Sequence, residues 1–387
     1  MVYDVYRWKV PYRIPIIDEP IVEAVLRVMR SGALFRGEDT RAFEQEMADY
    51  VGVKYGASTN SGTSALALMW EGLAYPAGSE VIMQANGYIA GASTAMQAGL
   101  RPVFVEPDEE THTLDVERVR EAITPRTRAI YAIHMYGHPT DMDPLVALCE
   151  RHGIDLIEVL AHATGARYRG RKVGSFGRAA MTTFGSKMVT VNGLGGMLLT
   201  NEEALAAGAI SLRKNVPDQG VDYYHMERLP HNYQLSEPLA AMGRINLRRL
   251  DEHIARRRQH AARLTAMLRA ADLPIHLPVE REWATHAYLH YVIRAPHRDE
   301  LRAFLADRRV EARLHYECPV YLIGPIRRAL GHDRGDFPIS DRICSEVISL
   351  PVGPWLSDDQ VDYLGEQVVD FFKTRVRPAA KPEAARR

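Results

Sequence analysis

One lysine of this chain, Lys187, lies in a segment that is otherwise uncharged, "MTTFGSKMVTVNGLGGMLLTN" (residues 181–201). An ammonium group is costly to bury unless it is solvated, is paired with a counter-ion or has a lowered pKa. A lowered pKa leaves the amine free at neutral pH, so that it can attack an aldehyde and form a Schiff base. Lys187 is therefore a candidate catalytic residue.

A second segment, "NSGTSAL" (residues 60–66), follows a short apolar run and opens a helical pattern. The free N–H groups and the dipole at a helix start attract anions, and Gly62 would let a phosphate approach closely. Thr63 could add a hydroxyl donor. A helix cap followed by a glycine turn explains the same residues without a ligand, so both interpretations stay open. A phosphate site together with a reactive lysine suggests pyridoxal phosphate.

Other chemistries find less support. The run "NGLGGMLL" lacks the G-x-G-x-x-G spacing and leads into a strand, and the chain has neither a phosphate-binding G-x-x-x-x-G-K-[ST] loop nor a G-x-S-x-G nucleophile motif. His134 and His138 are four residues apart, but Gly137 and Pro139 interrupt any helix that could align them. Without a cysteine pair or carboxylate cluster to complete a set, we expect hydrogen-bonded histidines and no metal site.

The elements that position these residues alternate between short apolar runs and helical patterns. The runs are nearly continuous in hydrophobicity, as strands covered on both faces must be. The expected strands are residues 80–85, 102–107, 128–137, 154–161 and 195–200, and the expected helices are residues 61–73, 115–123 and 143–152. This order predicts a large α/β domain with a mostly parallel sheet.

A long amphipathic stretch, residues 237–268, leads to a second part in which helices mix with strand-like runs such as residues 286–294. A chain of 387 residues is also long for one core. We therefore expect a large α/β domain with an N-terminal arm over residues 1–245, a smaller α+β domain over residues 246–376, and a disordered tail over residues 377–387.

The net charge of −1 gives no reason to expect nucleic acid or an anionic membrane as partner, and we expect Arg256 to His260 to form a solvated helix face. The three cysteines, Cys149, Cys318 and Cys344, are odd in number and scattered, which favours a reducing compartment. The N-terminus has no apolar signal core, and no run reaches the ~18 apolar residues of a membrane helix. These features predict a cytoplasmic protein.

Several ordered segments resemble one protein family, the DegT–StrS group of fold-type-I pyridoxal-phosphate enzymes, which are sugar and cyclitol aminotransferases. The resemblance covers about residues 20–370 and rests on the segments "RGEDTRAFEQEMADYVGVKYGASTNSGTSAL", "EVIMQANGYIAGASTAMQAGLRPVFVEPD", "AIHMYGHPTDMDPL", "ATGARYRGRKVGSFG", "FGSKMVTVNGLGGMLLTN", "HNYQLSEPLAAMGRINLRRLDEHIARR" and "ISLPVGPWLSDDQV". It implies an aspartate-aminotransferase-like large domain with a seven-stranded type of sheet, and pyridoxal 5'-phosphate as cofactor.

The resemblance also implies roles for individual residues. Lys187 sits where the family has its Schiff-base lysine, which later moves protons at the substrate carbon. Gly62 and Thr63 match the phosphate-binding helix start, and Thr182 takes the place of a serine that also contacts the phosphate. These four residues are therefore expected to lie in one site.

Three further positions follow from the same resemblance. Tyr88 falls where the family stacks an aromatic ring on the pyridine, and His162 takes the place of a residue, usually glutamine and sometimes histidine, near the phenolic oxygen of the cofactor. Asn232 matches an asparagine that reaches the phosphate in the neighbouring subunit. A homodimer with shared active sites is therefore implied.

The chain departs from the family at the segment "IEVLAHA", where Val159 replaces an aspartate. That aspartate keeps the pyridine nitrogen protonated, so that the ring withdraws electrons from the substrate. Glu158 is adjacent, but successive strand residues face opposite sides, so it could substitute only in a bulged or slipped strand. Gln234 and Leu194 also replace an arginine and an acidic residue of the family.

The first interpretation of function is transamination of a keto-sugar, possibly nucleotide-linked, or a keto-cyclitol, with glutamate or glutamine as amino donor, in amino-sugar or secondary-metabolite biosynthesis. Because Val159 cannot replace the aspartate, a second interpretation keeps the cofactor but changes the reaction to epimerisation or elimination. A third is a protein that binds the cofactor or a sugar without catalysis.

Overall fold

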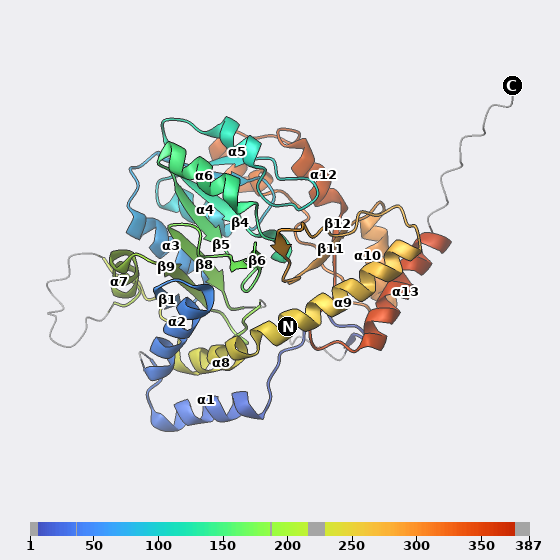
Figure 1. The fold of residues 1–387 in the computed structure, drawn as a ribbon, viewed down its shortest axis with the longest axis horizontal. Helices are drawn as coiled ribbons and strands as arrows, with labels where there is room; N and C mark the ends of the chain where they lie inside the picture. The colour runs from blue at the N-terminus through green and yellow to red at the C-terminus, as the bar shows by residue number, and fades with distance from the viewer. Residues whose placement is uncertain (1–6, 36, 186–187, 216–228, 376–387) are drawn as a thin grey trace.

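A sheet of seven strands lies at the centre of the computed structural model (Figure 1), which describes residues 7–35, 37–185, 188–215 and 229–375. The strand order is β1-β9-β8-β5-β4-β2-β3. The bounds are β1 Tyr55–Thr59, β2 Glu80–Gln84, β3 Arg101–Val105, β4 Thr127–Ile133, β5 Asp155–Val159, β8 Ala179–Thr183 and β9 Gly196–Thr200. The pairs among β3, β2, β4, β5 and β8 are parallel, and only β9 runs antiparallel to its neighbours. The predicted α/β class with a mostly parallel sheet is confirmed.

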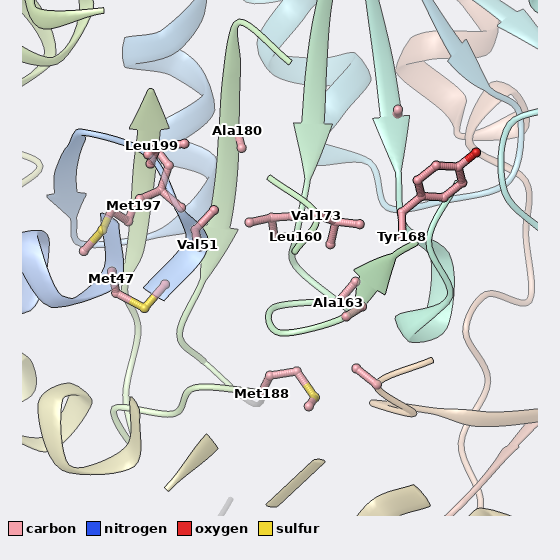
Figure 2. Packing of buried hydrophobic residues seen from close by; sticks show 14 of the residues in the cluster. Met47, Val51, Leu160, Ala163, Tyr168, Val173, Ala180, Met188, Met197 and Leu199 are labelled. Carbon is pink, nitrogen blue, oxygen red and sulfur yellow. The ribbon is translucent and has the colours of Figure 1, made fainter. Parts of the chain in front are cut away.

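Helices cover both faces of this sheet, which explains the near-continuous hydrophobicity of its strands. One face packs against α2 (Glu38–Val51) and α6 (Met142–His152), and the other against α3 (Gly62–Leu73), α4 (Ala90–Gln97) and α7 (Glu203–Leu212). Figure 2 shows part of the first cluster, where Met47 and Val51 of α2 lie near Met197 and Leu199 of β9. The connection after β3 contains α5 (Val116–Ala122).

The long amphipathic stretch over residues 237–268 forms two helices, α8 (Glu237–Arg248) and α9 (Leu250–Ala270), which meet at Arg249. The helix α1 (Glu19–Ser31) packs beside α8, while α9 continues along α13 (Asp358–Thr374) (Figure 1). Two cores are linked by α9, because its Ile254 belongs to the first hydrophobic cluster and its Leu264 to the third.

The third cluster is built around a small antiparallel sheet of β11 (Tyr291–Arg294) and β12 (Val347–Leu350), so the strand predicted over residues 286–294 is shorter than expected. The other elements of this part are α10 Arg298–Asp307, η4 Val320–Leu322, α11 Gly324–Leu330 and α12 Pro338–Glu346. Short strands β6 (Arg167–Tyr168), β7 (Arg171–Lys172) and β10 (Ala284–Thr285) form a third sheet.

The domain boundary expected between residues 245 and 246 stays a prediction and falls within α8. The expected tail, residues 377–387, lies outside the described residues. None of the described helices is long and apolar enough to cross a membrane.

Candidate active site

A cavity of about 450 Å³ opens at the carboxyl ends of β4, β5 and β8, whose last residues Ile133, Val159 and Thr183 all line it. Ligands of open α/β sheets bind at this edge. Three parts of the chain form the wall: the strand ends and helix starts of the large sheet, an N-terminal arm that includes Tyr12, and C-terminal residues that include Tyr316. The cavity is therefore a site that no single segment of the sequence could build.

The start of α3 has the features of an anion cradle. Ser61 caps the helix by accepting a hydrogen bond from the Ser64 backbone N–H at 3.0 Å, which confirms the cap interpretation. The first amides of a helix have no partner within it, and Gly62 and Thr63 both line the cavity. A Cβ on Gly62 would lie 2.8 Å from Cβ of Thr183, so only glycine fits here. The cradle therefore suits a phosphate as well as a cap.

The structure does not place Thr182 in this cradle. Its side chain lies on the other face of the sheet, where its hydroxyl is 2.9 Å from that of Thr164 and is buried. Strand side chains alternate between faces, so the next residue, Thr183, lines the cavity instead. Thr183 is thus the threonine of β8 on the cavity side, where its hydroxyl donates to the Gly195 backbone carbonyl at 3.0 Å.

Tyr88 and His162 both line the cavity, Tyr88 at its exposed mouth and His162 in its buried part. Tyr88 is 60% exposed at the mouth, and its ring centre lies 5.9 Å from that of Tyr316. His162 is buried, with Nδ1 accepting from the Tyr136 backbone N–H at 3.3 Å and Nε2 3.2 Å from the Tyr316 hydroxyl. Burial raises the pKa of Tyr316, so the phenol stays neutral beside the imidazole.

A cluster of aromatic rings and imidazoles that the sequence did not reveal completes this wall. His290 and His315 stack with their ring centres 3.9 Å apart, and the Tyr12 hydroxyl forms a short hydrogen bond with Nδ1 of His290. Tyr136 donates from its hydroxyl to the backbone carbonyl of His315. Because these residues lie far apart in the chain, no local spacing could have indicated that they meet.

Val159 lies at the floor of the cavity and is buried. The register is regular on both sides, with Val159 opposite Ile133 on β4 and opposite Met181 on β8. The strand is therefore neither bulged nor slipped at this position, and Val159 faces the cavity. Valine is the residue that the structure presents where the resemblance expects an aspartate.

Glu158 faces the opposite side and is fully buried. Its carboxylate accepts hydrogen bonds from the backbone N–H groups of Gly174 at 2.6 Å and of Phe176 and Gly177 at 2.7 Å. Nε2 of His134 lies 3.1 Å from the same carboxylate. With four partners on the far face of the sheet, Glu158 is a structural residue that cannot replace the missing aspartate.

Replacing Glu158 by alanine is expected to lower the free energy of unfolding by about 3–5 kcal/mol, because buried donors would lose their acceptor. Urea unfolding followed by fluorescence would measure the loss. The exposed Glu203, which makes no side-chain hydrogen bond within the described chain, is the matched control. Glu203→Ala should stay within about 1 kcal/mol of the wild type. Equal midpoints for the two variants would contradict this role of Glu158.

Two sequence-predicted residues lie outside this cavity or outside the described chain. Lys187 is not among the described residues, but the nearest described residues on each side, Gly185 and Met188, both line the cavity. Asn232 is exposed and does not line it; its side-chain oxygen accepts a hydrogen bond from Gln234 at 3.4 Å. Leu194, 72% exposed, stands at the mouth.

The expectation that Arg256 to His260 form a solvated face is wrong for two members, because Arg257 and His260 are buried. The Arg257 guanidinium lines the cavity, where one nitrogen donates to the carbonyls of Tyr288 and Leu289 at 3.3 Å each. No carboxylate pairs with it within the described chain, and burial lowers its pKa to about 10. At neutral pH it remains a cation in the cavity wall.

The histidine pair is explained by ordinary hydrogen bonds, as expected. Nδ1 of His134 accepts from the Thr140 backbone N–H at 3.0 Å, and Nε2 of His138 accepts from the Arg281 N–H at 3.2 Å. Among the residues that the structure describes, no group of three or more His, Cys, Asp or Glu side chains could hold a metal ion.

Comparisons with known proteins agree with this geometry. The sequence model of the DegT/DnrJ/EryC1/StrS aminotransferase family matches residues 15–369. The chain is 39% identical to the erythromycin biosynthesis sensory transduction protein EryC1 of Saccharopolyspora erythraea, over 89% of this chain and 93% of that protein. It is 38% identical to dTDP-3-amino-3,4,6-trideoxy-alpha-D-glucose transaminase of Streptomyces venezuelae, over 87% and 88%.

Solved structures of aminotransferases are also similar to this chain over most of its length. The crystal structure of S. venezuelae DesV in complex with a ketimine intermediate has a TM-score of 0.86 at 37% identity, over 92% of this chain and 95% of DesV. Helicobacter pylori PseC, an aminotransferase involved in the biosynthesis of pseudoaminic acid, has a TM-score of 0.87 at 23% identity, over 94% and 99%, which bears on the fold alone. The predicted fold of the fold-type-I aminotransferases is confirmed.

Proposed function

The chain belongs to the DegT/DnrJ/EryC1/StrS aminotransferase family, whose members are pyridoxal-phosphate enzymes, and we propose that it transfers an amino group from glutamate or glutamine to a keto-sugar or keto-cyclitol. One observation carries the proposal: α3 begins at Gly62, and this helix start lines the same cavity as His162, Tyr88 and the residues flanking Lys187. Amino-sugar or secondary-metabolite biosynthesis is the proposed setting.

The residues present fit pyridoxal 5'-phosphate. Gly62 and Thr63 would hold the phosphate, since both line the cavity at the start of α3, where the first amides have no partner within the helix. Tyr88 would cover one side of the ring, and His162 would hydrogen-bond its phenolic oxygen. When bound, the cofactor supplies an aldehyde that accepts the amino group and a ring that withdraws electrons from the substrate carbon.

Lys187 would hold the cofactor covalently and then move a proton at the substrate carbon, roles that need an amine with a lowered pKa. An apolar cavity wall, to which side chains such as Met181 and Val159 contribute, would favour a neutral amine. The wall formed by Tyr12, His290 and Tyr316 would exclude bulk water and offer hydrogen bonds to sugar hydroxyls.

The substrate we propose is a keto-sugar carried by a nucleoside diphosphate. The cavity wall contains the buried Arg257 cation, which lacks a carboxylate partner among the described residues and suits a diphosphate or a donor carboxylate. Relatives of this chain are named as transaminases of dTDP-linked and UDP-linked sugars. Both observations support an anionic substrate.

The absorbance spectrum of the purified protein with pyridoxal phosphate, recorded before and after addition of glutamate or glutamine, tests the proposal. Transamination predicts conversion of the bound cofactor to its pyridoxamine form, and a keto-sugar should then restore the first spectrum. Failure to bind the cofactor, or a spectrum unchanged by any amino donor, would refute it.

A second candidate reaction is favoured by one observation, the apolar floor at Val159. A ring nitrogen without a carboxylate partner withdraws electrons poorly, which suits epimerisation or elimination better than transamination. In that case the sugar would be consumed while amino donors leave the cofactor spectrum unchanged.

We also propose a homodimer with shared active sites and a cytoplasmic location. Val22, Leu26 and Met29 form an exposed apolar stripe along α1, of the kind that subunit contacts cover. Asn232 is exposed and does not line the cavity of its own chain, as expected of a residue that serves a partner.

The proposed cytoplasmic location is supported by the cysteines. All three are free, which agrees with a reducing compartment.

Mixing two inactive variants should restore activity if the sites are shared. A heterodimer of Lys187→Ala and Asn232→Ala chains would contain one site with both residues intact, so roughly a quarter of all sites recover after random exchange. Activity of the refolded mixture, compared with each variant treated alone, measures this. If Asn232 served its own chain, no site would recover and the mixture would stay as inactive as its components.

A further inference from the structure

The deepest part of the cavity offers a ring nitrogen almost no polar partner. The side chains around Val159 there are apolar: Leu66, Ile133 and Met181. Glu158 is turned to the far face and His134 is bonded there, so neither can reach in. If the proposed cofactor binds with its ring over Val159, its nitrogen needs another partner or none.

A polar side chain of the adjacent strand, Tyr131 of β4, shares this face of the sheet with Val159. Tyr131 pairs with Ile157 and Ile133 pairs with Val159, so Tyr131 and Val159 point to the same side from adjacent strands. Both belong to the same hydrophobic cluster, and both line the cavity.

Gly91, near the start of α4, leaves room for the end of the Tyr131 ring. A Cβ at residue 91 would lie 2.6 Å from Cε1, 2.7 Å from Cζ and 2.9 Å from the hydroxyl oxygen of Tyr131. Any other residue would therefore push the phenol out of its place. Gly91 has no left-handed backbone conformation that would require glycine, so this close approach is the structural reason for it.

The Tyr131 hydroxyl is free to bind a ligand. Tyr131 is 4% exposed, and among the described residues its hydroxyl makes no hydrogen bond, although its ring contacts Trp70. Because Tyr131 lines the cavity, a ligand bound there can accept a hydrogen bond from this hydroxyl. Burial raises the pKa of Tyr131, so the group keeps its proton and acts as a donor.

We propose that the Tyr131 hydroxyl donates a hydrogen bond to the pyridine nitrogen of the cofactor, in the place where related enzymes use a carboxylate. A neutral phenol satisfies the nitrogen lone pair without transferring its proton, so the ring stays uncharged. The inference rests on the proposed binding of pyridoxal phosphate, and it makes this chain's ring a weaker electron acceptor than one facing an aspartate.

The ¹⁵N NMR resonance of the ring nitrogen in protein loaded with labelled cofactor tests the inference directly. The wild type should show an unprotonated, hydrogen-bonded nitrogen. In Tyr131→Phe the resonance should move downfield towards that of unbonded pyridine, and the cofactor should bind roughly 2–10-fold more weakly, as loss of one neutral hydrogen bond predicts. Gly91→Ala should shift the resonance in the same direction, because its Cβ displaces the phenol.

Tyr75→Phe is the matched control. The Tyr75 ring also contacts Trp70, but its hydroxyl donates to Asp155 at 2.6 Å, away from the cavity. It should change neither the resonance nor the affinity. A protonated nitrogen in the wild type, or a resonance indifferent to Tyr131→Phe, would overturn the inference while leaving cofactor binding intact. Protein that binds no cofactor would overturn the proposed function as well.

Discussion

Lys187→Ala protein is expected to bind pyridoxal phosphate without a covalent bond and to lose amino transfer by roughly 10³-fold or more, because one amine holds the cofactor and moves the proton. Borohydride reduction followed by peptide mass analysis should find the cofactor on Lys187 of the wild type and on no peptide of the variant. The steady-state rate with glutamate or glutamine would measure the loss.

Lys54→Ala is a suitable control, because Lys54 is exposed and lies outside the cavity lining. It should keep both the label and the rate. A label on another lysine of the wild type would show that the position between Gly185 and Met188, which line the cavity, does not carry the reactive amine.

Val159→Asp is expected to speed conversion of the bound cofactor to its pyridoxamine form by on the order of tenfold to a hundredfold. A carboxylate at the cavity floor would hold the ring nitrogen protonated through a charge-assisted hydrogen bond of roughly 1.5–3 kcal/mol, and about 1.36 kcal/mol corresponds to tenfold in rate. Stopped-flow absorbance after mixing with glutamate or glutamine would measure the change.

Asparagine has almost the same shape as aspartate but carries no charge, so Val159→Asn should give no such gain in rate. The carboxylate should also make Tyr131 less important, so that Tyr131→Phe shifts the ring-nitrogen resonance less when it is combined with Val159→Asp. If the wild type already converts fast and aspartate adds nothing, some group other than Glu158, which is bound on the far face, must protonate the ring.

The aspartate substitution should also cost stability before the cofactor binds. An ionised side chain at the apolar floor beside Met181 and Ile133 has no counter-ion there among the described residues. Unfolding midpoints of Val159→Asp should therefore be lower than those of the wild type without cofactor and recover when it is added, since ligand binding stabilises the folded state.

Much of the fold could be predicted from local patterns. Apolar runs bounded by polar residues located β2, β3, β4, β5 and β9 within a few residues, and the Ser61–Gly62 pair located the start of α3. These signals are local because strand hydrophobicity reflects burial on both faces, and a helix cap involves residues three apart. The break at Arg249 has no local signal, because both halves of the stretch keep helical periodicity and no proline or glycine marks the junction.

The sequence by itself determined the order of the elements, the glycine at the start of α3 and the valine where a carboxylate was expected. Tertiary structure alone decided which side chains share the cavity. It turned Thr182 and Glu158 to the far face, buried Arg257 in the wall, and brought Tyr12, His290 and His315 together from distant segments. It also set Tyr131 against Gly91. Side-chain alternation and long-range packing fix these positions, and neither leaves a spacing that can be read along the chain.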